Sequence, residues 1–233
     1  MISQSARNNA EWCHAMCRAH GIPTAFQERA WTSERRTPPL YPDAVTLAPD
    51  ATAHDVLSEI DREAPGCSVK DSFGRLDLAA DGFEVLFEAR WIHRPASLVA
   101  PVAPDDVVWR PLRTEPGLAA WEAAWSDGDE DLVGLFRPEL LADRTTTLLA
   151  GTTDGGTRTV AGAVVSRSSA VVGVSHVFGS DGDLERAWAG CLAAVAHFWP
   201  GVPVVGYEHG EDLDAATRQG FIPGAPLTVW SAD

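Results

Sequence analysis

The stretch from Thr145 to His209 restricts the possible folds more than any other part of the chain. Three runs with strand character lie close together in it: TTTLLAGTT, RTVAGAVVSRS and AVVGVSHVF. The first two are joined by Asp154-Gly155-Gly156, which is typical of a hairpin turn. An amphipathic helix, LERAWAGCLAAVAHFW, follows the capping residue Asp183, and the buried strand VPVVGYEH comes next. This order predicts a sheet that is covered by helices.

Further patterns on either side complete the second half of the chain. VVWRPL indicates a strand, GLAAWEAAWSD an amphipathic helix, and DLVGLFRPELLAD a second, shorter helix. At the far end, DLDAATRQG predicts a short helix and LTVWS a last strand. The Pro/Ala-rich stretch PASLVAPVAPDD resembles a linker. We therefore predict an N-terminal α/β region over residues 1–100 and a separate domain over residues 105–233.

The first hundred residues give a weaker pattern. A helix is expected over residues 4–20, an extended loop over 22–42, and two strands around a turn at Asp81-Gly82. Cys13 and Cys17 share one side of that first helix, but no cysteine or histidine spacing fits a usual zinc site. We expect buried free thiols and no metal.

The acidic charge restricts the classes of partner. The chain has a net charge of −15, and residues 101–233 carry 19 acidic and 8 basic side chains. Because nucleic acids and anionic membranes bind through Lys and Arg, neither is an expected partner. There is no signal-peptide pattern and no apolar run of the ~20 residues that a membrane span needs, so we expect a cytoplasmic protein. The charge would attract a cationic small molecule, although solubility alone also explains it.

The succession over residues 105–233 resembles the GNAT acetyltransferase superfamily. The most specific piece is VPVVGYEHGEDLDAATRQGF followed by LTVW, where a strand leads to a short helix, a Gly-Phe pair and a final strand. The resemblance implies an α+β fold, with a GNAT-like mixed sheet flanked by helices. It also implies a splay between the strands 170–178 and 202–208. Residues 1–100 are either a partial GNAT-like unit or an extension.

The resemblance further implies acetyl-CoA or another acyl-CoA as cofactor. Family members hold its pyrophosphate on backbone N–H groups after the fourth strand, in the pattern Arg/Gln, two residues, Gly, one residue, Gly/Ala. In HVFGSDGD, His176 takes the first position, Gly179 matches, and Asp181 stands at the last small residue. The candidate cofactor-binding residues are Val174, Ser175, His176, Gly179, Gly182 and Asp183. Since Asp181 and Asp183 bring negative charge to a phosphate site, a plain turn capped by Asp183 remains the alternative.

Three residues are candidates for catalysis. The family's general-acid tyrosine is absent, because counting back from Gly220-Phe221 places Ala216 at its position. His176, Glu208 and His209 end neighbouring strands, where open sheets place ligands, and each can take a proton from an acceptor amine. We therefore predict an N-acyltransferase that acts on a small amine and leave a homodimer open. The alternatives are a binding or assembly module that does not use CoA, or a different reaction in the same cleft.

Overall fold

The chain divides into two compact units. The computed structural model describes residues 1–63 and 65–232, and for Asp154 and Asp181 it describes the backbone alone. The first unit comprises Met1–Trp91 with Gly224–Asp233, and the second comprises Ile92–Pro223. The predicted regions 1–100 and 105–233 follow the order of the sequence, whereas the structure groups the last strand with the first unit.

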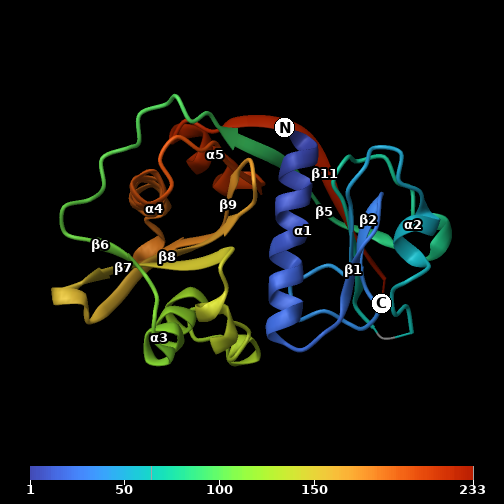
Figure 1. Cartoon of the computed structure of the whole chain (residues 1–233), viewed down its shortest axis with the longest axis horizontal. Helices are drawn as coiled ribbons and strands as arrows, with labels where there is room; N and C mark the ends of the chain where they lie inside the picture. The colour runs from blue at the N-terminus through green and yellow to red at the C-terminus, as the bar shows by residue number, and fades with distance from the viewer. Residues whose placement is uncertain (64, 233) are drawn as a thin grey trace. The chain divides into compact units, whose positions relative to one another are not determined.

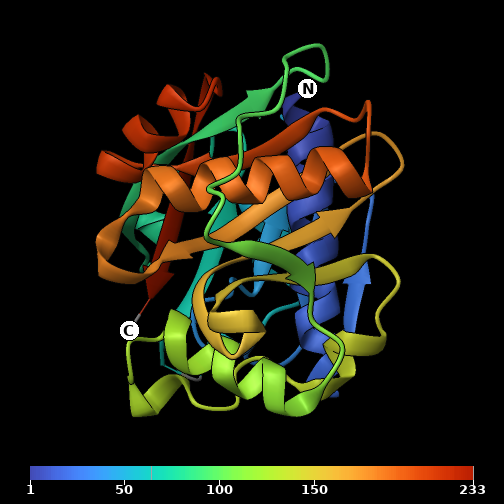
Figure 2. The ribbon, with the colours of Figure 1, turned by 90° about the vertical axis from the view of Figure 1, so that its left-hand side faces the viewer.

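The second unit is a mixed sheet with helices on both faces. Its strands follow the order β5-β10-β9-β8-β7-β6, and all neighbours from β6 to β9 are antiparallel, whereas β9 and β10 are parallel. Helix α4 and helix α3 lie on opposite sides of these strands (Figures 1 and 2). The elements are β5 (Glu84–Arg94), β6 (Val108–Pro111), α3 (Glu115–Trp125), β7 (Thr146–Thr153), β8 (Arg158–Arg167), β9 (Val172–Gly179), α4 (Leu184–Phe198), β10 (Val204–Glu208) and α5 (Gly210–Arg218).

The core of the second unit lies between the sheet and α4. Trp188, Cys191 and Val195 of the helix are buried in one cluster with Val172 and Val174 of β9. Burial raises the pKa of the Cys191 thiol to about 12, because the charged thiolate is poorly solvated there. All four cysteines are buried free thiols, as predicted.

Among the described residues, no helix combines the length and the apolarity needed to cross a bilayer.

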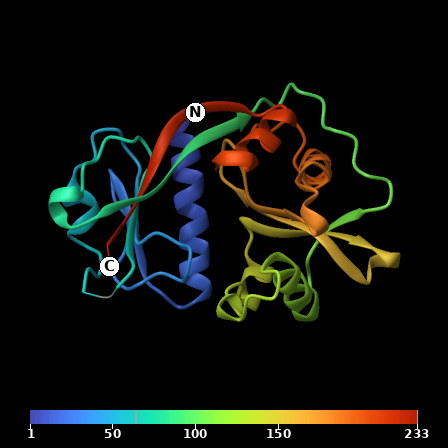
Figure 3. The ribbon, with the colours of Figure 1, turned by 180° about the vertical axis from the view of Figure 1, so that it is seen from behind.

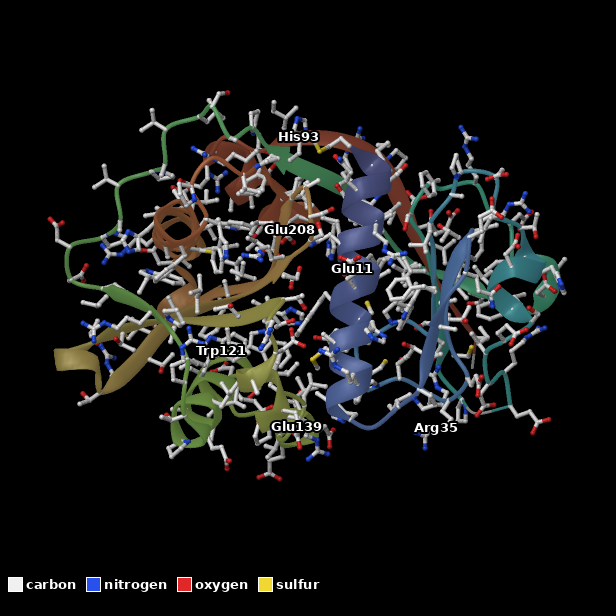
Figure 4. The ribbon with its side chains drawn as sticks, viewed as in Figure 1. Glu11, Arg35, His93, Trp121, Glu139 and Glu208 are labelled. Carbon is white, nitrogen blue, oxygen red and sulfur yellow. The ribbon has the colours of Figure 1, made fainter. Side chains whose placement is uncertain are left out.

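Aromatic side chains fill the opposite face, beneath α3. Trp121, labelled in Figure 4, is fully buried and donates its indole N–H to the carbonyl of Leu149 at 2.9 Å. Its ring meets Phe136 and Phe178 edge to face, with centroids 4.9 and 5.2 Å away. Gly162 of β8 leaves the necessary room, because a Cβ there would lie 2.1 Å from the indole nitrogen.

The segment after α3 is not the second α-helix that the sequence predicts. It forms two short 3-10 helices, Glu130–Leu132 and Pro138–Ala142, separated by Gly134 with a φ of +78°. Glu122 of α3 explains this path. Its buried carboxylate accepts the N–H of Gly134 at 2.8 Å and that of Phe136 at 2.7 Å, so the two backbone groups bond to a side chain and not within a helix.

Replacing this carboxylate tests how the segment is held. Glu122→Ala is expected to lower the free energy of unfolding by about 2–3 kcal/mol, because two N–H groups lose their acceptor. Glu139→Ala, which removes an exposed carboxylate from the same segment, is the control and is expected to change stability by less than about 0.5 kcal/mol. Urea unfolding of the three proteins measures the difference. Equal stability of both variants would contradict the role of Glu122.

The strands of the first unit follow the order β1-β2-β3-β4-β11-β5. Strands β3 and β4 are parallel, and the pairs β1–β2, β2–β3 and β4–β11 are antiparallel. Strands β5 and β11, which run side by side in Figure 3, each continue from one unit into the other. The elements are α1 (Ile2–Ala19), β1 (Thr24–Phe26), β2 (Ala30–Ser33), β3 (Ala44–Thr46), α2 (Ala53–Leu57), β4 (Cys67–Asp71) and β11 (Ile222–Ala232).

Two predictions for the first unit are wrong. The expected loop over 22–42 contains the paired strands β1 and β2. The expected pair of strands around Asp81-Gly82 is one strand, β5, because the residues after β4 bond to the buried carboxylate of Asp71. That carboxylate accepts the N–H groups of Phe73, Arg75 and Leu76 at 3.1, 2.5 and 2.7 Å. The turn uses these donors, so they are not available to a strand ladder.

Candidate functional site

The parallel strands β9 and β10 separate towards their carboxyl ends. Their pairing joins Val204 to Val172 and Val205 to Gly173, and in the described part of the chain it does not extend to the last residues of either strand. Gly206 still lies close to β9, since a Cβ on it would be 2.8 Å from the carbonyl oxygen of Val174. Beyond this point no further pairing joins the described residues of the two strands, as the predicted splay requires. Such a splay leaves backbone N–H and C=O groups at two strand edges for a ligand.

His176 lies at a bulge in β9 beside this splay. The register with β8 shifts between Val164↔Ser175 and Gly162↔Phe178, so β9 carries one extra residue here. His176 has a φ of +52°, which is unusual for a residue with a side chain and marks a locally strained position. Its ring nitrogen Nδ1 is 3.0 Å from the Ser175 hydroxyl oxygen. The bulge thus sets the direction of two of the predicted site residues.

Two aromatic rings flank the imidazole of His176. The ring centroids of Trp125 and Phe136 lie 5.4 and 5.5 Å from it, and the two rings meet each other nearly at right angles. No local signal connects either residue to His176, because the contact arises only when α3 and the segment after it pack under the sheet.

Glu208 is the titratable group at the splay with a strongly shifted pKa. It ends β10, three residues after the last paired position Val205, and His176 likewise comes three residues after Gly173. Its side chain, labelled in Figure 4, is half-buried. Burial and, to a lesser extent, the negative charge of Asp212 raise its pKa to about 8. A carboxyl with this pKa exchanges protons near neutral pH, as a general base requires.

The neighbours of Glu208 and the position of the family's tyrosine lie in different surroundings. His209 is exposed and precedes α5 as its N-cap residue, without a side-chain hydrogen bond to the helix. Tyr207 is half-buried. Ala216, at the position of the family's tyrosine, is fully buried in the core, so no hydroxyl stands there.

The loop after β9 closes onto its own backbone. Residues 180–182 form a 3-10 turn, and the N–H of Asp183 donates to the Ser180 carbonyl at 3.4 Å. The Asp183 carboxylate caps α4 by accepting the N–H of Arg186 at 3.1 Å. The space left by the missing side chain of Gly179 is filled, because a Cβ there would lie 2.6 Å from the carbonyl oxygen of Asp183. The alternative of a capped turn thus accounts for Gly179 and Asp183. The side chain of Asp181 lies outside the described residues.

A cavity of about 530 Å³ adjoins this loop, between the end of β9, the first turn of α4 and helix α5. Of the predicted cofactor-binding residues, Gly179, Gly182 and Asp183 line it. The charged residues in its lining are Asp183, Glu185, Glu211, Asp212 and Arg218. Within the described part of the chain, four carboxylates and one guanidinium thus line the cavity, and the guanidinium is paired with Glu185. The pairing of Glu185 with Arg218 joins α4 to α5, and no local sequence pattern indicates it.

The site suits only one part of acyl-CoA, the cofactor that the resemblance implies. The splay of β9 and β10 suits a pantetheine arm, whose amides pair with strand edges. The pyrophosphate does not fit the loop, because Asp183 already caps the helix and three more carboxylates line the cavity. Each charge pair near 4 Å opposes binding by about 1 kcal/mol even in water. Within the described residues, no group of His, Cys, Asp or Glu is arranged to hold a metal ion.

Comparison with known proteins finds likeness in structure only. No protein-family model and no curated protein matches the chain. A GCN5-related N-acetyltransferase from Kribbella flavida is 15% identical, with 98% of this chain and 95% of that one covered and a TM-score of 0.59. A GNAT-family protein from Novosphingobium aromaticivorans is 16% identical, with coverages of 90% and 91% and a TM-score of 0.57. A functionally unknown protein from Staphylococcus epidermidis is 10% identical, with 73% of each chain covered and a TM-score of 0.58.

These identities are too low to carry a substrate from one protein to another, but the shared architecture covers almost the whole chain in two of the three cases. The mixed sheet, the flanking helices and the splay of β9 and β10 agree with it. The α+β fold predicted from the sequence is confirmed, and the chain has the fold of the GCN5-related N-acetyltransferases.

Proposed function

We propose that the second unit is an N-acyltransferase that moves an acyl group from a thioester to a small amine. The observation that carries the proposal is the splay of β9 and β10, with Glu208 and His176 each three residues beyond the last paired residue of its strand. A thioester of the pantetheine type can lie along the open strand edges and bring its carbonyl to this level. The fold of the neighbouring structures supports the same reaction class.

Glu208 is the proposed general base. An alkylammonium is not nucleophilic, and the Glu208 carboxylate takes its first proton. The amine nitrogen then forms a bond to the acyl carbon, the carbon–sulfur bond breaks, and the second amine proton leaves with the thiolate as a thiol. Glu208 returns its proton to solvent. With its pKa near 8, it is a stronger base than an exposed carboxylate, and a minor fraction of it is ionised at neutral pH.

His176 has a positioning role in this proposal. The bulge sets the direction of its side chain, and its contact with the Ser175 hydroxyl orients the imidazole. His209 is an exposed N-cap residue on the neighbouring strand end, and it serves as a second candidate for proton exchange with solvent. The acidic second half of the chain favours a cationic acceptor, because exposed charges steer a ligand of opposite sign.

The occupied cap of α4 and the acidic cavity favour a second candidate function. In it, the second unit is a binding or assembly module that keeps the fold and uses no thioester. The two functions differ in a simple measurement. An enzyme releases thiol only when both thioester and amine are present, whereas a module releases none.

A panel of amines with several acetyl thioesters, read by thiol release, tests the proposal. We expect turnover with at least one cationic amine, and a lower rate as salt rises from 0.02 to 0.5 M, because screening shortens the reach of exposed charges to roughly 10 Å at 0.1 M and less above it. Thiol release that does not depend on amine would indicate hydrolysis. No thiol release from any combination of thioester and amine would contradict the enzyme proposal and favour the module.

A further inference from the structure

We infer that the acyl donor is a pantetheine thioester that lacks the nucleotide diphosphate of CoA, such as one carried as a single phosphodiester or as free pantetheine. The inference rests on the proposed function and names its donor class. It follows from two neighbouring parts of the site that favour different parts of a CoA molecule. The splay of β9 and β10 suits the neutral pantetheine arm, whereas the cavity beyond it opposes a polyphosphate.

The helix terminus that would bind phosphate is already capped by the chain. A phosphate at an α-helix N-terminus accepts backbone N–H groups of the first turn. Here the N–H of Arg186 donates to the carboxylate of Asp183, and the N–H of Asp183 donates to the Ser180 carbonyl. Asp183 supplies the negative charge that the dipole of α4 favours. An incoming phosphate has to compete with a carboxylate that is covalently part of the site.

The charged residues of the cavity reinforce this exclusion. Among the side chains that the structure describes, its lining contains four carboxylates and one guanidinium, that of Arg218, which pairs with Glu185. The other nearby cation, Arg186, is held at 2.6 Å by Asp106 and at 3.5 Å by Asp183. Arg186 lines a separate cavity of about 250 Å³ on the side of β6 to β8. Neither arginine is placed to neutralise a pyrophosphate and a ribose phosphate in the larger cavity.

Gly179 has a structural explanation that needs no phosphate. Its missing side chain makes room for the carbonyl of Asp183 and for Ala187, with a hypothetical Cβ at 2.6 and 3.2 Å from them. The glycine therefore allows the turn and the start of α4 to pack against the end of β9. The one residue that matches the family's phosphate pattern well is accounted for by packing.

Direct binding, without turnover, tests the inference. Calorimetry with the full chain compares reduced pantetheine, 4′-phosphopantetheine and CoA in 0.02 M and 0.3 M salt. We expect pantetheine to bind at least tenfold more tightly than CoA at low salt, with 4′-phosphopantetheine between them. We expect the ratio of the CoA and pantetheine dissociation constants to fall at high salt, since screening weakens the repulsion between the phosphates and the carboxylates. Tighter binding of CoA than of pantetheine overturns the inference and leaves the proposed function intact. Binding of none of the three overturns both.

Charge variants separate the cavity from the net charge of the chain. The double variant Glu185→Gln and Glu211→Gln removes two carboxylates and releases Arg218 from its ion pair. We expect it to tighten CoA by at least tenfold at low salt and so to lower the ratio of CoA to pantetheine dissociation constants. Glu28→Gln with Glu59→Gln removes the same charge from exposed positions of the first unit and serves as the control. An equal change in both double variants contradicts a local repulsion and overturns the inference.

Discussion

Glu208→Gln is expected to lower kcat by about two to four orders of magnitude, with whichever thioester and amine the wild-type protein turns over. Glutamine keeps the size and polarity of the side chain but cannot take a proton from an ammonium group. The effect should fall on kcat more than on KM, because the carboxylate acts in the reaction and not in holding the thioester. Steady-state kinetics with saturating thioester measure it. A variant with more than half of the wild-type kcat would remove Glu208 from the mechanism.

The pH dependence identifies the group more specifically. Below a pKa of about 8, the ionised fraction of Glu208 rises tenfold for each pH unit, and above it the fraction is constant. The plot of log kcat/KM against pH should therefore change slope near pH 8 for the wild type, and this bend should disappear in Glu208→Gln. Asp212→Asn is the matched variant. It removes a charge that raises the pKa of Glu208, so it should move the bend to lower pH without abolishing activity.

The Glu208 carboxyl also affects stability. Its ionisation, which activity requires, lowers the free energy of unfolding. Its folded pKa of about 8 lies above its unfolded value of about 4.5, so between these pH values the folded chain keeps a proton that the unfolded chain loses. The free energy of unfolding therefore falls as pH rises through this window. Glu208→Gln escapes the loss and should be more stable than wild type by about 1–3 kcal/mol at pH 9, with little difference at pH 4. Thermal unfolding at both pH values measures it.

Asp71→Ala is expected to destabilise the first unit by about 3–5 kcal/mol, which is a large part of the stability of most domains. The Asp71 carboxylate is 1% exposed and accepts three backbone N–H groups and the Thr46 hydroxyl, the last at 3.2 Å. Alanine leaves these donors without an acceptor inside the protein. Hydrogen exchange during urea unfolding, read separately on peptides of each unit, localises the loss.

Asp77→Ala is the control for this result. Asp77 lies in the same turn region, but it is exposed and accepts a single N–H, that of Ala79 at 3.1 Å. Its loss should cost less than about 1 kcal/mol. Similar costs for the two variants would mean that Asp71 does not organise the path of the chain between β4 and β5.

Sequence patterns predicted most elements of the second unit because each is a local property. The alternation of apolar residues in β7 to β9, the cap at Asp183 and the stop at Pro200-Gly201 act within a few residues of where they occur. The same holds for Glu208 and His176, which were found because they end predicted strands. Two elements failed where a buried carboxylate, that of Glu122 or of Asp71, accepts backbone N–H groups that a helix or a strand ladder would otherwise use.

The sequence by itself determined the α+β class, the order of strands and helices in the second half, the acidic charge and the identity of the residues at the strand ends. Only the tertiary structure decided what those residues do. The bulge at His176, the raised pKa of Glu208 and the ion pair between Glu185 and Arg218 all arise from packing between elements. The same is true of the last strand, which the order of the chain attaches to one half and the pairing of β11 with β4 attaches to the other. Propensity and capping depend on neighbours in sequence, whereas burial, charge coupling and strand pairing depend on neighbours in space.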